Sequence, residues 1–210
     1  MAPEDFIRTN AALLPPPLVP EISLYLATEV VPLWHKTEEE LALIGVPPPY
    51  WAFAWAGGQA LARYILDNPS LVAGKAVLDI GSGSGLVGLA AAKAGAAHVL
   101  AADIDAFSCA AIRLNAAANH LVIAVTQDDL IGQPGAWDLI LVGDLFYERP
   151  LAERLLAWLR PMTIPALLGD PGRSYFPKDG LEKLASYTVQ TSRDLEDREI
   201  RETGVYRLVP

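Results

Sequence analysis

The chain has 210 residues, a length that fits one domain with a full hydrophobic core but not two ordinary domains. Hydrophobic residues make up 52% of it and charged residues 20%, which excludes a disordered protein. A formal net charge of -9 argues against a nucleic acid as partner, because the phosphate backbone would be repelled. The same charge suits a basic patch on a protein partner.

Cysteine, histidine and terminal patterns exclude several further classes. Cys109 is the only cysteine, so we expect no internal disulfide and no thiolate metal cluster. The histidines lack the spacing of metal ligands, and we expect no metal. No stretch approaches the ~18 apolar residues of a membrane span, and Met1–Asp5 is acidic where a targeting signal would be basic. We therefore expect a cytoplasmic protein that does not bind membranes.

Residues 1–49 are expected to form a proline-rich N-terminal appendage, and residues 50–210 a single globular unit. Within the appendage, apolar residues alternate over 22–26, which predicts a strand. Residues 37–40 have the spacing of a capping box and predict a short helix that ends before Gly45. The sequence does not place this appendage relative to the rest of the chain.

An aromatic run leads into the globular unit. Trp51, Phe53 and Trp55 lie within five residues and are followed by Gly57 and Gly58, after which a helix is expected to about residue 68. Large aromatic side chains suit core packing equally well. The paired glycines favour a ligand, because they let it approach the backbone at a helix N-terminus.

Residues 77–88 predict a buried strand, a glycine-rich turn and the start of a helix. The pattern is D-x-G-x-G-x-G, with Asp79 before Gly81, Gly83 and Gly85. A dinucleotide fingerprint would need Gly or Ala where Leu86 stands. The loop resembles the nucleotide loop of class I methyltransferases, which bind S-adenosylmethionine. On the loop alone, a nicotinamide or flavin site and a turn without a ligand stay open.

From residue 77 onward, strand and helix signals alternate, which is typical of a parallel sheet wrapped by helices. Helices are expected at 106–119 and 151–160, the first capped by Asp105. The expected strands are 77–80, 98–103, 122–126, 137–143 and 166–169, with two more near 187–192 and 204–209 that pair as a hairpin.

Aspartates stand at the ends of the expected strands and therefore at one edge of the sheet, where ligands of open parallel sheets bind. Asp103 ends the second strand and is suited to accept both hydroxyls of a ribose. Asp128 or Asp129, after the third strand, could accept from the amine of an adenine. The sequence does not separate these two, and a loop turn is an equally fair interpretation. Asp144 ends the fourth strand.

Five segments stand out: Pro48–Tyr64, Leu78–Gly85, Ala102–Asp105, Gly143–Tyr147 and Gly169–Arg173. Together they resemble the electron transfer flavoprotein beta-subunit lysine methyltransferases. The resemblance covers about residues 6–178, while the C-terminal hairpin matches only in outline. The tryptophan–glycine run, D-x-F-Y and G-D-P-G-R are far more specific than the glycine loop.

This resemblance implies a Rossmann-like α/β fold, the seven-stranded class I methyltransferase sheet with its last strand antiparallel. It implies S-adenosyl-L-methionine as the cofactor and the beta subunit of electron transfer flavoprotein as the protein substrate. We expect the enzyme to be a monomer. Another protein substrate, a small-molecule methyltransferase and a non-catalytic cofactor-binding protein stay open. The residues assigned are Asp144 and Tyr147 to catalysis; Trp55, Gly58, Asp79, Gly81, Gly83, Asp103, Asp128 and Asp144 to the cofactor; and Trp51, Phe146 and Glu148 to the substrate.

The chemistry of lysine limits what Asp144 can do. A free lysine has a pKa of about 10.4 and must lose a proton before its amine attacks a methyl group. A nearby carboxylate favours the charged ammonium, so Asp144 cannot lower that pKa. We therefore expect Asp144 to hold and aim the lysine, while apolar surroundings from Phe146, Trp51 and the ring of Tyr147 favour the neutral amine.

Overall fold

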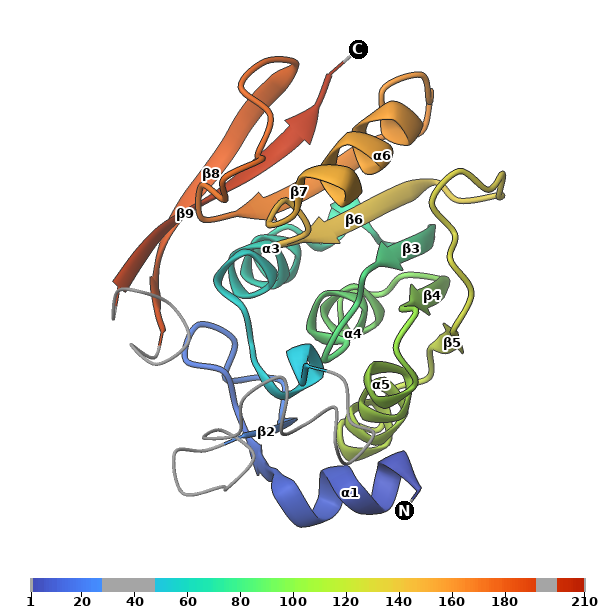
Figure 1. Ribbon diagram of the computed structural model, residues 1–210, viewed down its shortest axis with the longest axis vertical. Coiled ribbons are helices and arrows are strands. Elements are labelled where there is room, and N and C mark those ends of the chain that lie inside the picture. The colour runs from blue at the N-terminus through green and yellow to red at the C-terminus, as the bar shows by residue number, and fades with distance from the viewer. Residues whose placement is uncertain (1, 28–47, 192–199, 210) are drawn as a thin grey trace.

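One seven-stranded sheet forms the centre of the computed structural model, which describes residues 2–27, 48–191 and 200–209 (Figure 1). The strands run in the order β5-β4-β3-β6-β7-β9-β8, and β9 alone runs in the direction opposite to the other strands. The expected fold, including the antiparallel last strand and the C-terminal hairpin, is therefore confirmed. The strands are β3 (Ala76–Ile80), β4 (His98–Ala102), β5 (Ala124–Thr126), β6 (Leu139–Gly143), β7 (Ala166–Asp170), β8 (Leu181–Gln190) and β9 (Ile200–Leu208).

Helices cover both faces of this sheet. Strand β6 is buried on both sides, because Leu141 packs in the cluster of α3 and α4 and Ile140 in that of α6. A continuous apolar strand is what a central parallel strand needs. The helices are α1 (Pro3–Asn10), α3 (Ala56–Asp67), α4 (Leu86–Lys93), α5 (Ala106–Ala118) and α6 (Arg149–Leu159), with short 3-10 helices η2 (Tyr50–Ala52) and η3 (Pro69–Leu71).

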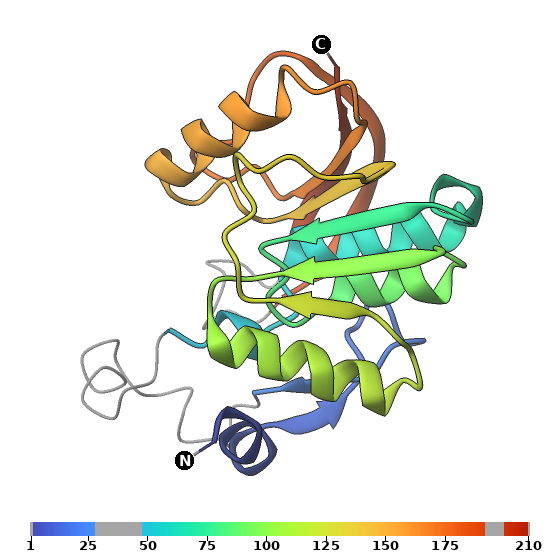
Figure 2. The ribbon, with the colours of Figure 1, turned by 90° about the vertical axis from the view of Figure 1, so that its right-hand side faces the viewer.

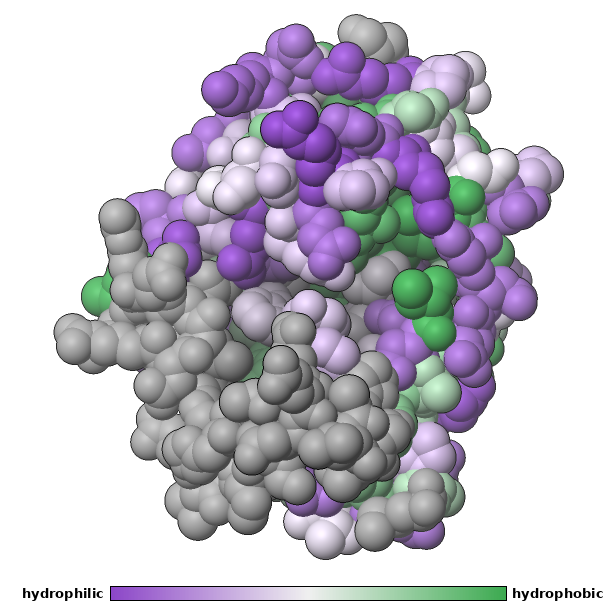
Figure 3. All heavy atoms as spheres, viewed as in Figure 1, coloured by the Kyte–Doolittle hydropathy of each residue, from purple (hydrophilic) through white to green (hydrophobic). Residues whose placement is uncertain are grey.

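The parallel strands β3, β4, β5 and β6 all point the same way in Figure 2. Their carboxyl ends therefore meet at one edge of the sheet, where loops carry the side chains that can face a ligand. Figure 3 looks onto this edge, where hydrophobic side chains are exposed among hydrophilic ones.

The described part of the N-terminal appendage is fastened to α5. Strands β1 (Ala12–Leu14) and β2 (Leu24–Leu26) form a separate antiparallel pair, which confirms the strand predicted there. The side-chain oxygens of Asn115 and Asn119 accept hydrogen bonds from the backbone of residues 25 and 23, at 2.7 and 2.9 Å. Helix α1 lies beside α5 (Figure 1). The helix predicted near residues 37–44 lies outside the described residues.

Several strand boundaries differ from the sequence prediction, among them that of β9, which begins at Ile200 and not near residue 204. Strand β5 begins at Ala124 because Val122 is 94% exposed and does not pair. Strand β6 begins at Leu139, two residues later than expected. Strand β8 begins at Leu181, well before residue 187, and pairs along its length with β9. It lies at the sheet edge, where both apolar and charged side chains are tolerated and clean alternation is lost.

Candidate functional site

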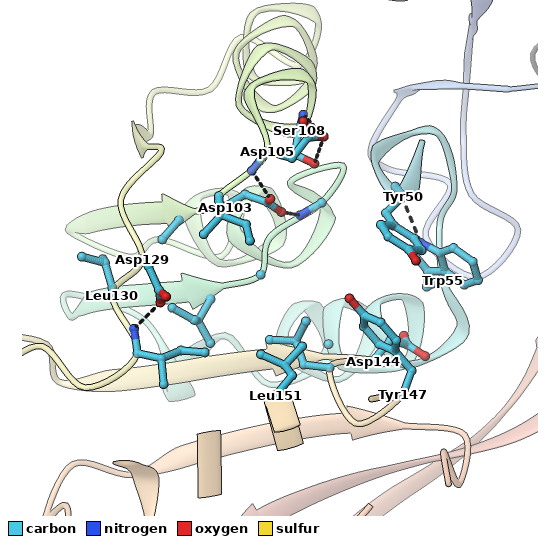
Figure 4. Close-up of a pocket in the computed structure, with 18 of the residues that line it drawn as sticks. Tyr50, Trp55, Asp103, Asp105, Ser108, Asp129, Leu130, Asp144, Tyr147 and Leu151 are labelled. Atoms are coloured by element: carbon cyan, nitrogen blue, oxygen red, sulfur yellow. Dashed lines mark hydrogen bonds between the residues drawn. The ribbon is translucent and has the colours of Figure 1, made fainter. Parts of the chain in front are cut away.

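A cavity of about 590 Å³ opens at the carboxyl ends of β3, β4, β5 and β6 (Figure 4). This volume is usual for a small-molecule site. Figure 4 shows three groups of side chains around it: Asp103, Asp105 and Ser108; Asp129 and Leu130; and the rings of Tyr50, Trp55 and Tyr147 near Asp144. The site therefore combines acidic acceptors with apolar and aromatic surfaces.

The glycine loop between β3 and α4 borders the cavity with bare backbone. Gly81 and Gly83 have φ angles of +61° and +53°, in the left-handed region that favours glycine. A Cβ atom on Gly81 would come within 2.5 Å of Leu145, whereas one on Gly83 would meet nothing closer than 3.9 Å. Gly81 thus makes room for the side chain of Leu145, and the loop leaves open space at Gly83, as close approach of a ligand to the backbone requires.

Asp103 follows β4 and is preorganised by the backbone around it. Its Oδ2 accepts from the backbone N–H of Gly83 at 2.8 Å, and its Oδ1 accepts from that of Asp105 at 3.0 Å. Burial raises the pKa of Asp103 above its usual value. A carboxylate has about four acceptor sites, so Asp103 can still accept hydroxyl groups from the cavity. Asp105 caps α5 as expected, accepting from the N–H groups of Phe107 and Ser108.

Asp79 plays a different part from Asp103. Its side chain is 1% exposed, and its Oδ2 accepts from the hydroxyl of Ser82 and, at 2.8 Å, from the backbone N–H of Gly88. Burial raises the pKa of Asp79 to about 7. Asp79 therefore holds the loop against the start of α4 and borders only a small pocket beside it. A direct contact between Asp79 and a cofactor stays a prediction.

The loop after β5 brings both of its aspartates to the cavity. Asp129 forms an ion pair with Arg154 and accepts from the backbone N–H of residue 131. Asp128 accepts from the hydroxyl of Thr126 at 2.6 Å. Because the carboxylate of Asp129 already binds the Arg154 guanidinium, Asp128 is the better candidate to accept a hydrogen bond from a ligand amine. The side chain of Ile104, 70% exposed, adds an apolar surface to the same cavity.

Asp144 lies where β6, the start of α3 and the loop after β7 meet. Its Oδ2 accepts from the backbone N–H of Gly58 at 2.9 Å. Its Oδ1 accepts from Nε and Nη2 of Arg173 at 3.1 and 2.8 Å. Its φ angle is +57°, a conformation that is uncommon outside glycine and often found at functional sites. The carboxylate, 8% exposed, borders the cavity.

Three aromatic rings stand beside Asp144 (Figure 4). The ring centroids of Tyr147 and Tyr50 are 5.7 Å apart, and those of Tyr50 and Trp55 are 6.2 Å apart. The indole N–H of Trp55 donates to the backbone oxygen of Tyr50 at 3.0 Å. Burial, followed by the neighbouring Tyr50, raises the pKa of Tyr147 to about 12, so its phenol stays protonated at neutral pH.

Two residues predicted to contact the substrate are buried in the structure. Trp51 is 0% exposed and packs with residues of α1 and α5, and Phe146 is 1% exposed, with its ring 5.3 Å from that of Phe176. Neither lines the cavity, because both side chains face the hydrophobic core. Both therefore support the site from the core, and their contact with a substrate stays a prediction. Glu148 is exposed and lies outside the lining of the cavity, and its contact with a substrate stays a prediction.

Arg173 and Asp170 were not assigned to the site from the sequence. The guanidinium of Arg173 lies 5.5 Å from the ring of Trp55 and borders the cavity. Asp170 ends β7, and its Oδ1 accepts from the backbone N–H groups of Gly172 and Arg173, each at 2.7 Å. The G-D-P-G-R motif at the end of a strand marks both residues as candidates for the site. The motif does not indicate that Arg173 contacts Asp144.

The described residues include neither a cluster of metal ligands nor a membrane-spanning helix. No group of three histidine, cysteine, aspartate or glutamate side chains there could hold a metal ion. No helix in the described part of the chain has the length and apolar character to cross a membrane.

Comparison with known proteins gave matches over part and over all of the chain. The ribosomal protein L11 methyltransferase (PrmA) family model matches residues 59–142. The electron transfer flavoprotein beta subunit lysine methyltransferase of Xenopus laevis is 38% identical, over 99% of this chain and 87% of its own length. The protein of that name from Homo sapiens is 39% identical, over 92% of this chain and 76% of its own.

Solved structures agree on the fold. The magnesium protoporphyrin IX methyltransferase of Synechocystis, solved with bound S-adenosylhomocysteine, has a TM-score of 0.55 at 16% identity. The match covers 73% of this chain and 81% of that one. The match to the L11 methyltransferase family model ends at residue 142, before Asp144. The matches to the two electron transfer flavoprotein relatives also include the part of the chain that carries Asp144, Tyr147 and Arg173.

Proposed function

The chain belongs to the family of electron transfer flavoprotein beta subunit lysine methyltransferases, and from this premise we propose that it transfers methyl groups from S-adenosylmethionine to lysine side chains of that beta subunit. One observation carries the proposal. The likeness to these relatives extends past the nucleotide loop to the side of the cavity where Asp144, Tyr147 and Arg173 meet.

The residues around the cavity fit the cofactor. The bare backbone at Gly83 admits a ligand, and Asp103 offers a preorganised acceptor for ribose hydroxyls. Asp128 would accept from the adenine amine. Trp55 and Gly58 border the small pocket between the loop and Asp144, next to the main cavity. When bound, S-adenosylmethionine supplies a methyl group on a positively charged sulfur, which a neutral amine can take.

The protein side chains would position the lysine and exclude water from it. The rings of Tyr50, Trp55 and Tyr147 narrow the approach to Asp144 and offer apolar surfaces to the aliphatic part of a lysine. Asp144 would hold and aim the amine. Tyr147 does not serve as an anionic base, because its raised pKa keeps the phenol protonated. Its ring would shape the slot through its contact with Tyr50, and catalysis would consist largely of positioning and desolvation.

The negative charge of the chain fits a protein substrate that carries lysines. A chain of net charge -9 would attract a lysine-bearing patch, and the association should weaken as salt rises. The same charge supports a protein substrate over a nucleic acid. That the enzyme works as a monomer in the cytoplasm, away from membranes, rests on its sequence alone.

The proposal is tested by incubating the purified protein with S-adenosylmethionine and folded electron transfer flavoprotein beta subunit. Peptide mass spectrometry should then find methyl groups on lysines of the subunit. Ribosomal protein L11 is the matched alternative substrate, because the L11 methyltransferase model matches the cofactor half of the chain. Methylation of L11 without methylation of the beta subunit would refute the substrate while leaving the methyltransferase class in place.

A further inference from the structure

An arginine is already bound to the carboxylate that is assigned to the substrate lysine. Two guanidinium nitrogens of Arg173 donate to Oδ1 of Asp144. The Arg173 side chain is 18% exposed and that of Asp144 8%, so solvent screens the pair poorly. The guanidinium is fixed from a second side by the ring of Trp55, 5.5 Å away. The two charges therefore balance each other at the edge of the cavity.

This balance matters because the reaction needs a neutral amine. An unpaired carboxylate within about 4–6 Å would raise the pKa of a lysine by about 1–3 units and hold it as ammonium. A carboxylate that already shares its charge with a guanidinium exerts much less of this effect. The pair can still accept a hydrogen bond from the amine, because Asp144 remains an acceptor at the cavity edge.

The other titratable groups around this point are Tyr50, Tyr147, Asp170 and Asp103, with the exposed Glu148 next to Tyr147 in the chain. The ring of Tyr50 faces it beside the phenol of Tyr147, whose pKa is raised to about 12 by burial. Asp170, from β7, is held beneath the loop of Arg173, and burial raises its pKa to about 7. Asp103 lies across the cavity after β4, where backbone N–H groups of residues 83 and 105 bind its carboxylate. Arg173 is thus the cation that directly offsets Asp144.

We propose that Arg173 is a positioning residue that neutralises Asp144, so that Asp144 can aim the substrate lysine without holding it in the protonated state. This inference rests on the proposed function, since it assigns the charge balance of the same acceptor site. The opposing possibility is that Arg173 competes with the substrate for Asp144 and must be displaced. The two possibilities predict opposite changes in the rate of methyl transfer at neutral pH when Arg173 is replaced. Removing a competitor would speed the reaction, whereas removing a neutralising charge would slow it.

The test compares Arg173→Gln with the wild type over a pH series from neutral to alkaline. We expect the rise of methyl transfer with pH to move upward by about 1–3 pH units, so that the variant is at least about tenfold slower at neutral pH and recovers at alkaline pH. Arg173→Lys keeps the charge and should stay close to the wild-type profile. Arg160→Gln is the matched control, because Arg160 pairs with Asp179 at the exposed surface.

A binding measurement tests the same charge balance without turnover. S-adenosylmethionine carries a positive sulfur that S-adenosylhomocysteine lacks, so an unpaired Asp144 should favour the former. We expect Arg173→Gln to increase the ratio of the two affinities by about three- to thirtyfold, measured by calorimetry at low salt. If Arg173→Gln does not fold, Arg173→Met removes the charge and keeps a long apolar stem over Trp55.

An unchanged pH profile together with an unchanged affinity ratio would overturn the proposal, as would a faster reaction of the variant at neutral pH. An equal loss of rate at every pH would also overturn it, because that is the result of a structural role. If the wild type methylates no lysine of the beta subunit, the proposed function fails, while the affinity ratio still decides whether Arg173 neutralises Asp144.

Discussion

The packing of α3 against β7 allows two neighbouring glycines to be compared directly. A Cβ atom on Gly57 would lie 2.2 Å from the backbone oxygen of Gly169 and 2.5 Å from Oδ2 of Asp144. A Cβ atom on Gly58 would meet only a methyl group of Val87, at 3.8 Å, which is ordinary contact. Both glycines lie in the first turn of α3. The sequence alone does not distinguish them.

Gly57→Ala should therefore lower the free energy of unfolding by about 1–3 kcal/mol, because a backbone oxygen cannot move aside as a flexible side chain can. Gly58→Ala should leave it unchanged or raise it by up to about 1 kcal/mol, as alanine does in a helix. Urea denaturation of both variants measures the difference, which appears as separate midpoints with similar slopes. Equal midpoints would refute the close approach of α3 and β7 on which the placement of Asp144 depends.

Three further results are expected. Asp103→Asn should weaken binding of S-adenosylhomocysteine by about 10–100-fold in calorimetry, since hydrogen bonds to a charged acceptor contribute about 1.5–3 kcal/mol, and equal affinity would remove the ribose assignment. Burial raises the pKa of Asp170 to about 7. Between about pH 4 and 7 the folded state therefore keeps a proton that the unfolded chain releases, and the free energy of unfolding should fall as pH rises through this range. Denaturation of Asp170→Asn should show a shallower fall, and an unaltered slope would contradict the shift. Tyr147→Phe should keep kcat/KM within a few-fold while Tyr147→Ala loses more than about tenfold, because the ring against Tyr50 shapes the slot; equal losses would assign the role to the hydroxyl.

The sheet could be predicted because its signals are local. Continuous apolar runs such as 139–142 mark strands buried on both faces, and Asp105 marks the start of α5. Strand β8 begins several residues before the strand that the sequence predicts, because an edge strand has no fixed pattern of burial. The carboxyl edge followed from the alternation of strands and helices, and with it the positions of Asp103 and Asp144 beside the cavity.

The roles of individual side chains depended on contacts between distant segments. Arg173 is 29 residues from Asp144 in the chain, and no local pattern indicates that their side chains meet. Trp51 and Phe146 belong to motifs that border the cavity, but their side chains point into the core. Sequence spacing does not reveal on which side of a loop a ring will lie, since tertiary packing decides it.

The most direct test of lysine presentation by Asp144 compares the wild type with Asp144→Asn on folded electron transfer flavoprotein beta subunit at saturating S-adenosylmethionine. Asparagine keeps the shape of the side chain and removes the charge that pairs with Arg173. Methyl-lysine formation, followed by mass spectrometry, should fall by orders of magnitude, while the affinity for S-adenosylhomocysteine stays within a few-fold. Full turnover by Asp144→Asn would contradict the role of Asp144, and absence of methyl-lysine with the wild type would contradict the proposed reaction.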